Sequence, residues 1–136
     1  MAGFWDRIAG LYDLAELTNR KVNKAAVKRV AELVPAGAEV LDCAAGTGAF
    51  SLAAARRAKR VLATDLSQPM LDRAAAKARR AGVSNIAYAI RDITALEEPD
   101  CAFDVALAAN VLHLLPEPGT AVRELWRVTK PGGRLI

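Results

Sequence analysis

The sequence predicts an α/β fold in which a mainly parallel sheet is covered by helices on both faces. Short apolar runs alternate with segments of helical periodicity along the chain, and no repeat or internal linker interrupts them. A Gly-rich turn follows the first apolar run, and polar residues follow the later ones. Strands that alternate with helices of this length imply right-handed crossovers between parallel strands, which is a doubly wound arrangement.

The first half of the chain supplies two helix–strand alternations. Residues 21–34 carry valine and alanine at helical spacing, and Pro35 ends that helix. A buried strand is expected to follow and to end near Asp42, and an Ala-rich helix is expected at 48–58. RVLATD (60–65) predicts a second strand.

A well-delimited helix is expected after this second strand. Ser67 is placed to act as its N-cap, with Pro69 in the first turn. Gly82 is placed as the C′ residue that stops it, followed by the apolar Val83.

The second half predicts strands at 85–90 and 103–109 and a helix at 117–129. On that helix we expect Val122 to be buried with Leu125 and Val128, and Trp126 to be partly buried. The KPGG segment (130–133) should terminate the helix, so that a fifth strand begins only with the last three residues.

Composition and charge restrict the class of protein. The chain has 136 residues, which is enough for one domain. Hydrophobic residues make up 53% of it and charged residues 25%, and this composition excludes wholesale disorder. The net charge of +4 is mild for a nucleic-acid-binding protein. No apolar run approaches the roughly 20 residues of a membrane span, and Asp6 and Arg7 lie where a signal peptide would be apolar. We therefore expect a cytoplasmic protein without a nucleic-acid partner.

The few metal-ligating residue types argue against a metal site. Cys43 and Cys101 are the only cysteines, and His113 is the only histidine. These three side chains cannot build a structural zinc site. No metal is expected.

In such sheets ligands bind beyond the carboxyl ends of the strands. After the first strand comes DCAAGTG (42–48), whose small residues let a ligand approach the backbone at a helix N-terminus. A dinucleotide fingerprint would need glycine at position 51, which is Ser51. The alternative is a small-residue turn that binds nothing.

Acidic residues follow the second and third strands. Asp65 is placed to accept both hydroxyls of a ribose, the alternative being a helix-capping aspartate. Asp92 and Ile93 suit an adenine, since a carboxylate accepts from its amino group and an aliphatic side chain covers its ring; the alternative is an ordinary loop aspartate. After the fourth strand, His113 is either a general base or a polar side chain packed beside the ligand.

Taken together and in order, these features resemble class I S-adenosylmethionine-dependent methyltransferases. VLDCAAGTGAF resembles the family's first motif, TDLSQPML the second, and RDITAL the loop after the third strand. FDVALAANVLHLLPEP and ELWRVTKPGGRLI resemble the fourth strand, its helix and the opening of the fifth strand. The group that the chain resembles is methyltransferase type 11, which includes the ubiquinone/menaquinone C-methyltransferases. Ala44 replaces the usual first glycine and adds only a methyl group.

The resemblance implies a Rossmann-like sheet with the strand order 3-2-1-4-5 and S-adenosylmethionine as cofactor, with S-adenosylhomocysteine as product. It implies in-line methyl transfer to an oxygen, nitrogen or carbon of a small-molecule acceptor, with the protein supplying alignment and exclusion of water. Two alternatives are an inactive cofactor-binding fragment or regulatory module, and a nicotinamide-dependent oxidoreductase. The missing third glycine argues against the oxidoreductase.

The resemblance also assigns residues. Asp42 would fix the Gly-rich loop and help to hold the methionine amino group, Met70 would lie beside the adenine, and Tyr12 would close over the methionine end. The candidates for a catalytic role are His113 and Tyr12. The expected cofactor-binding residues are Tyr12, Asp42, Ala44, Ala45, Gly46, Thr47, Gly48, Asp65, Leu66, Met70, Asp92, Ile93 and Asn110.

Two parts of the chain are expected: a helical lid or cap at 1–34 and a cofactor-binding core at 35–136. Phe4 and Trp5 belong either to a lid over the site or to a helix docked on the core, and the resemblance favours the lid. Family members usually continue beyond the fifth strand, so we expect a partial form that lacks the usual C-terminal strands. A sheet edge left open in this way invites pairing with another chain, and a homo-oligomer is a possible outcome.

Overall fold

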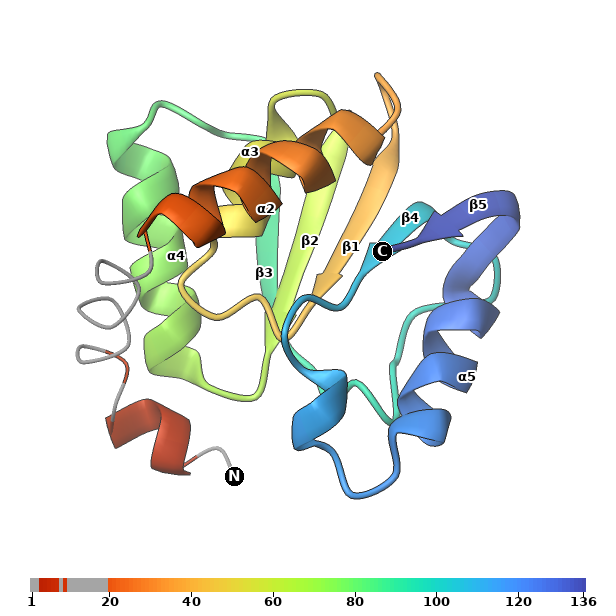
Figure 1. The fold of residues 1–136 in the computed structure, drawn as a ribbon. Helices are drawn as coiled ribbons and strands as arrows, with labels where there is room; N and C mark the ends of the chain where they lie inside the picture. The colour runs from red at the N-terminus through yellow and green to blue at the C-terminus, as the bar shows by residue number, and fades with distance from the viewer. Residues whose placement is uncertain (1–2, 8, 10–19) are drawn as a thin grey trace.

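The computed structural model describes residues 3–7, 9 and 20–136, which form a parallel sheet flanked by helices (Figure 1). The sheet order is β3-β2-β1-β4-β5, and all four pairings are parallel, which confirms the predicted topology. The strands are β1 Glu39–Cys43, β2 Arg60–Asp65, β3 Ile86–Ile90, β4 Phe103–Leu107 and β5 Thr129–Leu135.

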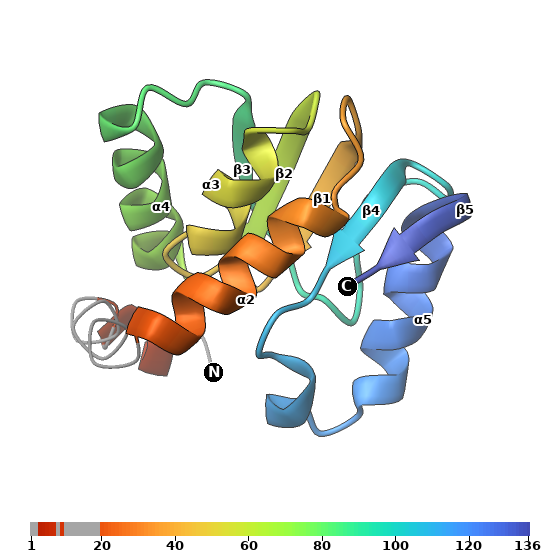
Figure 2. The ribbon, with the colours of Figure 1, turned by 45° about the horizontal axis from the view of Figure 1, so that its top comes forward.

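Helices cover both faces of this sheet (Figure 2). Residues 3–7 are helical and lie at the end of the sheet toward which the strands point. The other helices are α2 Arg20–Leu33, α3 Ala49–Ala55, α4 Gln68–Arg80, the 3₁₀ helix η1 Leu112–Leu114 and α5 Pro118–Val128.

Strand β1 is buried on both sides because its side chains alternate between two cores. Leu41 and Cys43 pack in one core with Leu125 of α5. Val40 packs in the other core with Ala54 of α3. This double burial explains why β1 is a continuous apolar run in the sequence rather than an alternating one.

The ends of α4 follow the predicted capping. The Ser67 hydroxyl accepts from the Met70 N–H at 3.3 Å at the start of the helix. At its end Gly82 has φ +70°, its N–H donates to the Arg79 carbonyl at 3.1 Å, and the Val83 N–H donates to the Ala78 carbonyl at 2.9 Å. This pair of bonds is a Schellman motif, so the helix boundaries are encoded locally.

Helix α5 corrects two predictions about burial. Its inward face consists of Ala121, Leu125 and Val128. Val122 is 41% exposed and Trp126 is 74% exposed, so the predicted burial of both is wrong. Each follows an inward-facing residue by one position, which is about 100° around the helix. The stripe of α5 that packs against the sheet is therefore narrower than the sequence suggests.

The fifth strand is longer than predicted and irregular. It begins at Thr129, which pairs with Phe103, and its next pair is Arg134 with Val105. The residues between, 130–133, bulge out of the ladder instead of ending the helix. Gly133 permits this, since a Cβ there would lie 2.7 Å from the Asp104 carbonyl oxygen.

The glycine at the start of α3 generates a stability prediction. Gly48 has φ +89°, and a Cβ on it would lie 2.7 Å from the Ala74 Cβ of α4. Gly48→Ala therefore adds a steric clash to the cost of a left-handed backbone, and we expect a loss of roughly 2–4 kcal/mol in unfolding free energy by urea denaturation. The matched control is Gly37→Ala, at φ +76° with nothing within 4 Å. Equal losses in the two variants would show that the contact with α4 is unimportant.

Candidate cofactor-binding site

A pocket lies at the carboxyl ends of β1, β2, β3 and β4, where the sequence places its polar strand-end residues. Eight of the expected cofactor-binding residues line it: Ala44, Gly46, Asp65, Leu66, Met70, Asp92, Ile93 and Asn110. Six further residues complete the lining, namely Trp5, Arg91, Ala109, Val111, Leu114 and Leu115. Several of these lie within one or two positions of a strand end or of a predicted site residue, which is the signal that could have identified them.

Asp65 joins two of the segments that form the pocket. One carboxylate oxygen, Oδ2, accepts from the Gly46 N–H at 2.9 Å, and the other, Oδ1, accepts from the Ser67 N–H at 3.0 Å. The loop after β1 is thereby tied to the turn after β2. Because each carboxylate oxygen has two lone pairs, Asp65 retains the capacity to accept from a ligand hydroxyl.

The loop after β1 has an unusual backbone. Ala44 has φ +53°, and the Ala45 N–H donates to the Thr64 carbonyl at 2.9 Å. A left-handed conformation costs a non-glycine residue roughly 1–2 kcal/mol. Alanine in this position therefore adds a conformational cost as well as the methyl group that the sequence suggests.

Asp42 is buried beneath the pocket and does not line it. Its side chain is 1% exposed, and Oδ2 accepts from the Ser51 hydroxyl of α3 at 2.6 Å. The side chain that bonds to the Gly46 N–H is Asp65, and the expected role of Asp42 in fixing the Gly-rich loop and holding the methionine amino group stays a prediction. Burial raises the pKa of the Asp42 carboxyl to about 7; the Ser51 hydrogen bond opposes this and the Asp65 charge adds to it.

Asp92 lines the pocket from a short turn that follows β3, the strand next to β2. Its Oδ1 accepts from both the N–H and the hydroxyl of Thr94, at 2.9 and 2.6 Å, and these bonds lower the pKa of the carboxyl. The turn closes with the Ala95 N–H on the Asp92 carbonyl at 3.0 Å. Ile93 is 7% exposed and packs in the α5-side core, so an ionised carboxylate stands beside a fixed aliphatic side chain.

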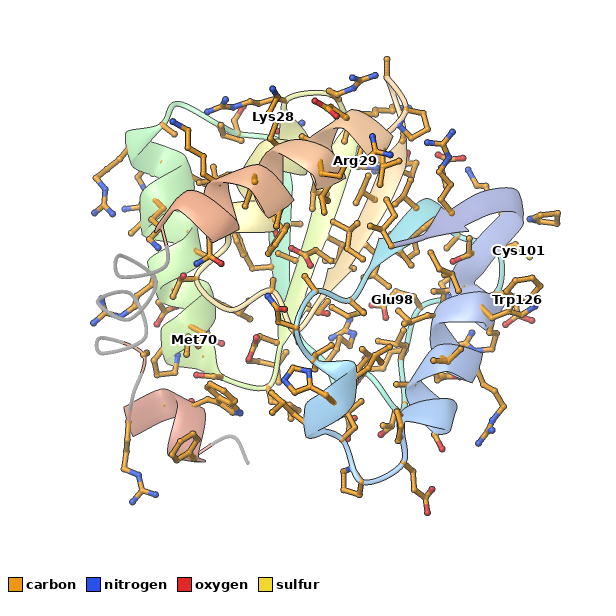
Figure 3. The ribbon with its side chains drawn as sticks, in the orientation of Figure 1. Lys28, Arg29, Met70, Glu98, Cys101 and Trp126 are labelled. Atoms are coloured by element: carbon orange, nitrogen blue, oxygen red, sulfur yellow. The ribbon has the colours of Figure 1, made fainter. Side chains whose placement is uncertain are left out.

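Apolar side chains make up much of the remaining wall. Met70 is 2% exposed at the start of α4, on the side of the helix formed by residues 3–7 (Figure 3). Trp5 of that helix also lines the pocket. At the mouth, Leu66 and Leu114 are 40% and 41% exposed. This combination suits a ligand that has an apolar part and polar groups at a few defined points.

The other predicted site residues do not line the pocket. Ala45, Thr47 and Gly48 lie in the loop behind it, and Thr47 is 1% exposed. His113 is an exposed residue of η1 and is absent from the lining, so its catalytic role stays a prediction. Tyr12 lies outside the described residues.

The buried Asp42 predicts a pH dependence of stability. Its pKa of about 7 lies above the value of 3.8 for an unperturbed aspartate, so the folded state holds a proton that the unfolded state has released. This term therefore lowers stability progressively as pH rises from about 4 to 7. Asp42→Asn cannot ionise, and its stability relative to wild type should rise by at least about 1 kcal/mol between pH 5 and pH 8 in urea unfolding.

The control for this prediction is Asp72→Asn, which removes an exposed carboxylate on α4. Its stability relative to wild type should change less over the same interval. An Asp42→Asn difference that is the same at both pH values would contradict the assignment of a raised pKa.

In the described part of the chain, no helix combines the length and the apolar character needed to cross a bilayer.

Comparison with known proteins agrees with this geometry. The family model of the methyltransferase domain matches residues 41–136. Malonyl-[acyl-carrier protein] O-methyltransferase of Serratia marcescens is 35% identical over 136 residues, which are 100% of this chain and 51% of the relative. Demethylmenaquinone methyltransferase of Clavibacter sepedonicus is 34% identical, covering 100% of this chain and 56% of the relative.

Among solved structures, the [4+2]-cyclase SpnF superposes with a TM-score of 0.76 at 36% identity, covering 82% of this chain and 42% of that chain. The chain spans about half the length of the curated relatives it matches. The family match covers well over half of the chain and includes the segments that line most of the pocket. The chain therefore belongs to the methyltransferase domain family, whose class I, S-adenosylmethionine-dependent members its motifs resemble.

Proposed function

We propose that the pocket binds S-adenosylmethionine and that the protein transfers its methyl group to a small-molecule acceptor. The observation that carries this proposal is the pair of carboxylates, Asp65 and Asp92, on neighbouring strand ends with apolar side chains beside them. A nucleoside presents hydroxyl donors on its sugar and an amino donor on its base, which are the groups that such a pair would accept.

The ribose would bind at Asp65. Its carboxylate is oriented before any ligand arrives, because the N–H groups of Gly46 and Ser67 hold both oxygens. A preoriented acceptor loses little side-chain entropy on binding. The same bonds keep the loop after β1 close to Asp65, and the small side chains of that loop let the ligand approach the loop's backbone.

The adenine would bind between Asp92 and the apolar side chains near it. Thr94 holds Oδ1 of Asp92, which leaves Oδ2 as the natural acceptor for the exocyclic amino group. Ile93 and Leu66 also line the pocket and would cover the ring. Met70 would contribute the apolar surface that the second motif implies.

When bound, the sulfonium of the cofactor supplies an activated methyl group. The chain's own residues would then orient the cofactor and exclude water from the reacting atoms. The exposed apolar rim of Leu66 and Leu114 supports an organic acceptor of small size. The proposal assigns no general base, since a sufficiently nucleophilic acceptor atom can attack the methyl group without one.

Cofactor binding is tested by calorimetry with S-adenosylhomocysteine and, separately, NAD. Wild-type protein should bind S-adenosylhomocysteine in preference to NAD. Asp65→Ala should weaken S-adenosylhomocysteine binding by roughly 1.5–3 kcal/mol, the range for hydrogen bonds to a charged group. The matched control is Asp72→Ala, an exposed aspartate outside the pocket, which should bind as wild type does.

Unchanged affinity in Asp65→Ala would refute the assignment of Asp65 to the ribose. Preferential binding of NAD would refute S-adenosylmethionine as the cofactor. Because a cyclase is among the similar solved structures, binding does not by itself establish methyl transfer. Turnover is tested by incubating the protein with S-adenosylmethionine and a panel of small phenols, amines and carbon acids. Acceptor-dependent release of S-adenosylhomocysteine supports the reaction, and its absence across the panel counts against it.

A further inference from the structure

We propose that Glu98 is a positioning residue that determines base specificity: it holds the Arg91 side chain so that Asp92 remains available to accept the amino group of adenine. This inference rests on the proposed function. It concerns two residues to which the sequence motifs assign no role, and a carboxylate that does not itself line the pocket.

Among the residues that the structure describes, Arg91 is the only cationic side chain in the pocket lining, and it could compete for the acceptors there. It is the first residue after β3, it lines the pocket, and its backbone N–H donates to the Asp65 carbonyl at 3.1 Å. Asp92 is its neighbour in the chain. A guanidinium left unrestrained beside an ionised carboxylate would pair with it, and that pairing would occupy the acceptor that the base needs.

Glu98 supplies the restraint. The Arg91 Nε–H donates to Glu98 Oε1 at 2.8 Å, and Nη1 donates to the Ile90 carbonyl at 2.9 Å. The Glu98 side chain is only 9% exposed, so this charge-assisted bond is poorly screened by solvent. Glu97 also faces Arg91, at 3.6 Å, but its side chain is 72% exposed and an ion pair of that kind contributes little.

The loop that carries Glu98 is itself held in place. Arg127 of α5 donates through Nη1 to the Glu98 carbonyl at 2.8 Å and through Nη2 to the Leu96 carbonyl at 3.0 Å. Figure 3 shows Glu98 on the α5 side of the central strands. The backbone at Glu98 is therefore held by α5, and the bond between Glu98 and Arg91 anchors the guanidinium to the body of the fold.

Packing alone does not explain a glutamate at position 98, because burying its carboxylate is energetically unfavourable. Its second oxygen, Oε2, is buried and has no hydrogen-bond partner within the part of the chain that the structure describes. An apolar side chain would fill the same space without a buried, half-satisfied carboxylate. The feature that a carboxylate provides here, and an apolar side chain would not, is its bond to Arg91.

The chemical consequence concerns position 6 of the purine. Adenine presents an amino donor there, which an unpaired Asp92 oxygen accepts. Hypoxanthine presents a carbonyl oxygen, which the carboxylate repels and a released guanidinium would bind. With Arg91 on Glu98, the pocket should prefer the 6-amino base; with Arg91 released, that preference should fall.

The test measures the ratio of the dissociation constants for S-inosylhomocysteine and S-adenosylhomocysteine by calorimetry. Glu98→Leu should reduce this ratio by about tenfold, equivalent to one hydrogen bond to a charged group. The double variant Glu98→Leu/Arg91→Met should restore the adenine preference, since no guanidinium then competes for Asp92. Glu97→Gln, which removes the exposed neighbour, should leave the ratio unchanged.

Two further variants keep the test decisive. Glu98→Gln retains an acceptor for Nε and should preserve most of the preference, and Arg91→Met alone should preserve it fully even if Glu98→Leu does not fold. An unchanged ratio in Glu98→Leu, failure of the double variant to restore it, or loss of preference in Arg91→Met would overturn the inference. Failure of the wild-type protein to bind S-adenosylhomocysteine would instead overturn the proposed function.

Discussion

The parallel pairing of β1 with β2 on one side and β4 on the other is the constraint on which the rest of the structure depends. Because both faces of β1 are buried, most of its side chains are apolar, and the strand is covered by α3 on one side and α5 on the other. Because its neighbours run parallel to it, their carboxyl ends meet at one edge. Residues far apart in the sequence, such as Gly46, Asp92 and Asn110, thereby line one pocket.

Within that edge, hydrogen bonds to carboxylates decide the detailed geometry. Asp65 ties the loop after β1 to the start of α4, and Asp42 ties β1 to α3 through Ser51. The two carboxylates differ in burial, and only the partly buried one, Asp65, lines the pocket. Asp42 thus stabilises the packing of β1 against α3, while Asp65 lines the pocket where the proposed ligand would bind.

The sequence predicts best where one local interaction determines the outcome. The Ser67 cap and the Gly82 stop of α4 depend on neighbouring residues alone, and the structure confirms both. The side chains of α5 illustrate the opposite case. Leu125 and Trp126 are both apolar and adjacent, and only the position of the sheet decides that Leu125 is buried while Trp126 is 74% exposed. The bulge of β5 likewise depends on its pairing with β4.

The sequence by itself therefore determined the order of the elements and the strand ends at which the pocket forms, since periodicity and turn residues act over short distances. The strand order was an expectation from the resemblance to the methyltransferases, and the structure confirms it. Only the tertiary structure decided which strand-end side chains share the pocket. It placed Asp42 beneath the pocket, Arg91 in its wall, and Glu98 behind Arg91. The reason is physical: burial, and the partner that a charged group finds, depend on segments that the fold brings together from distant parts of the chain.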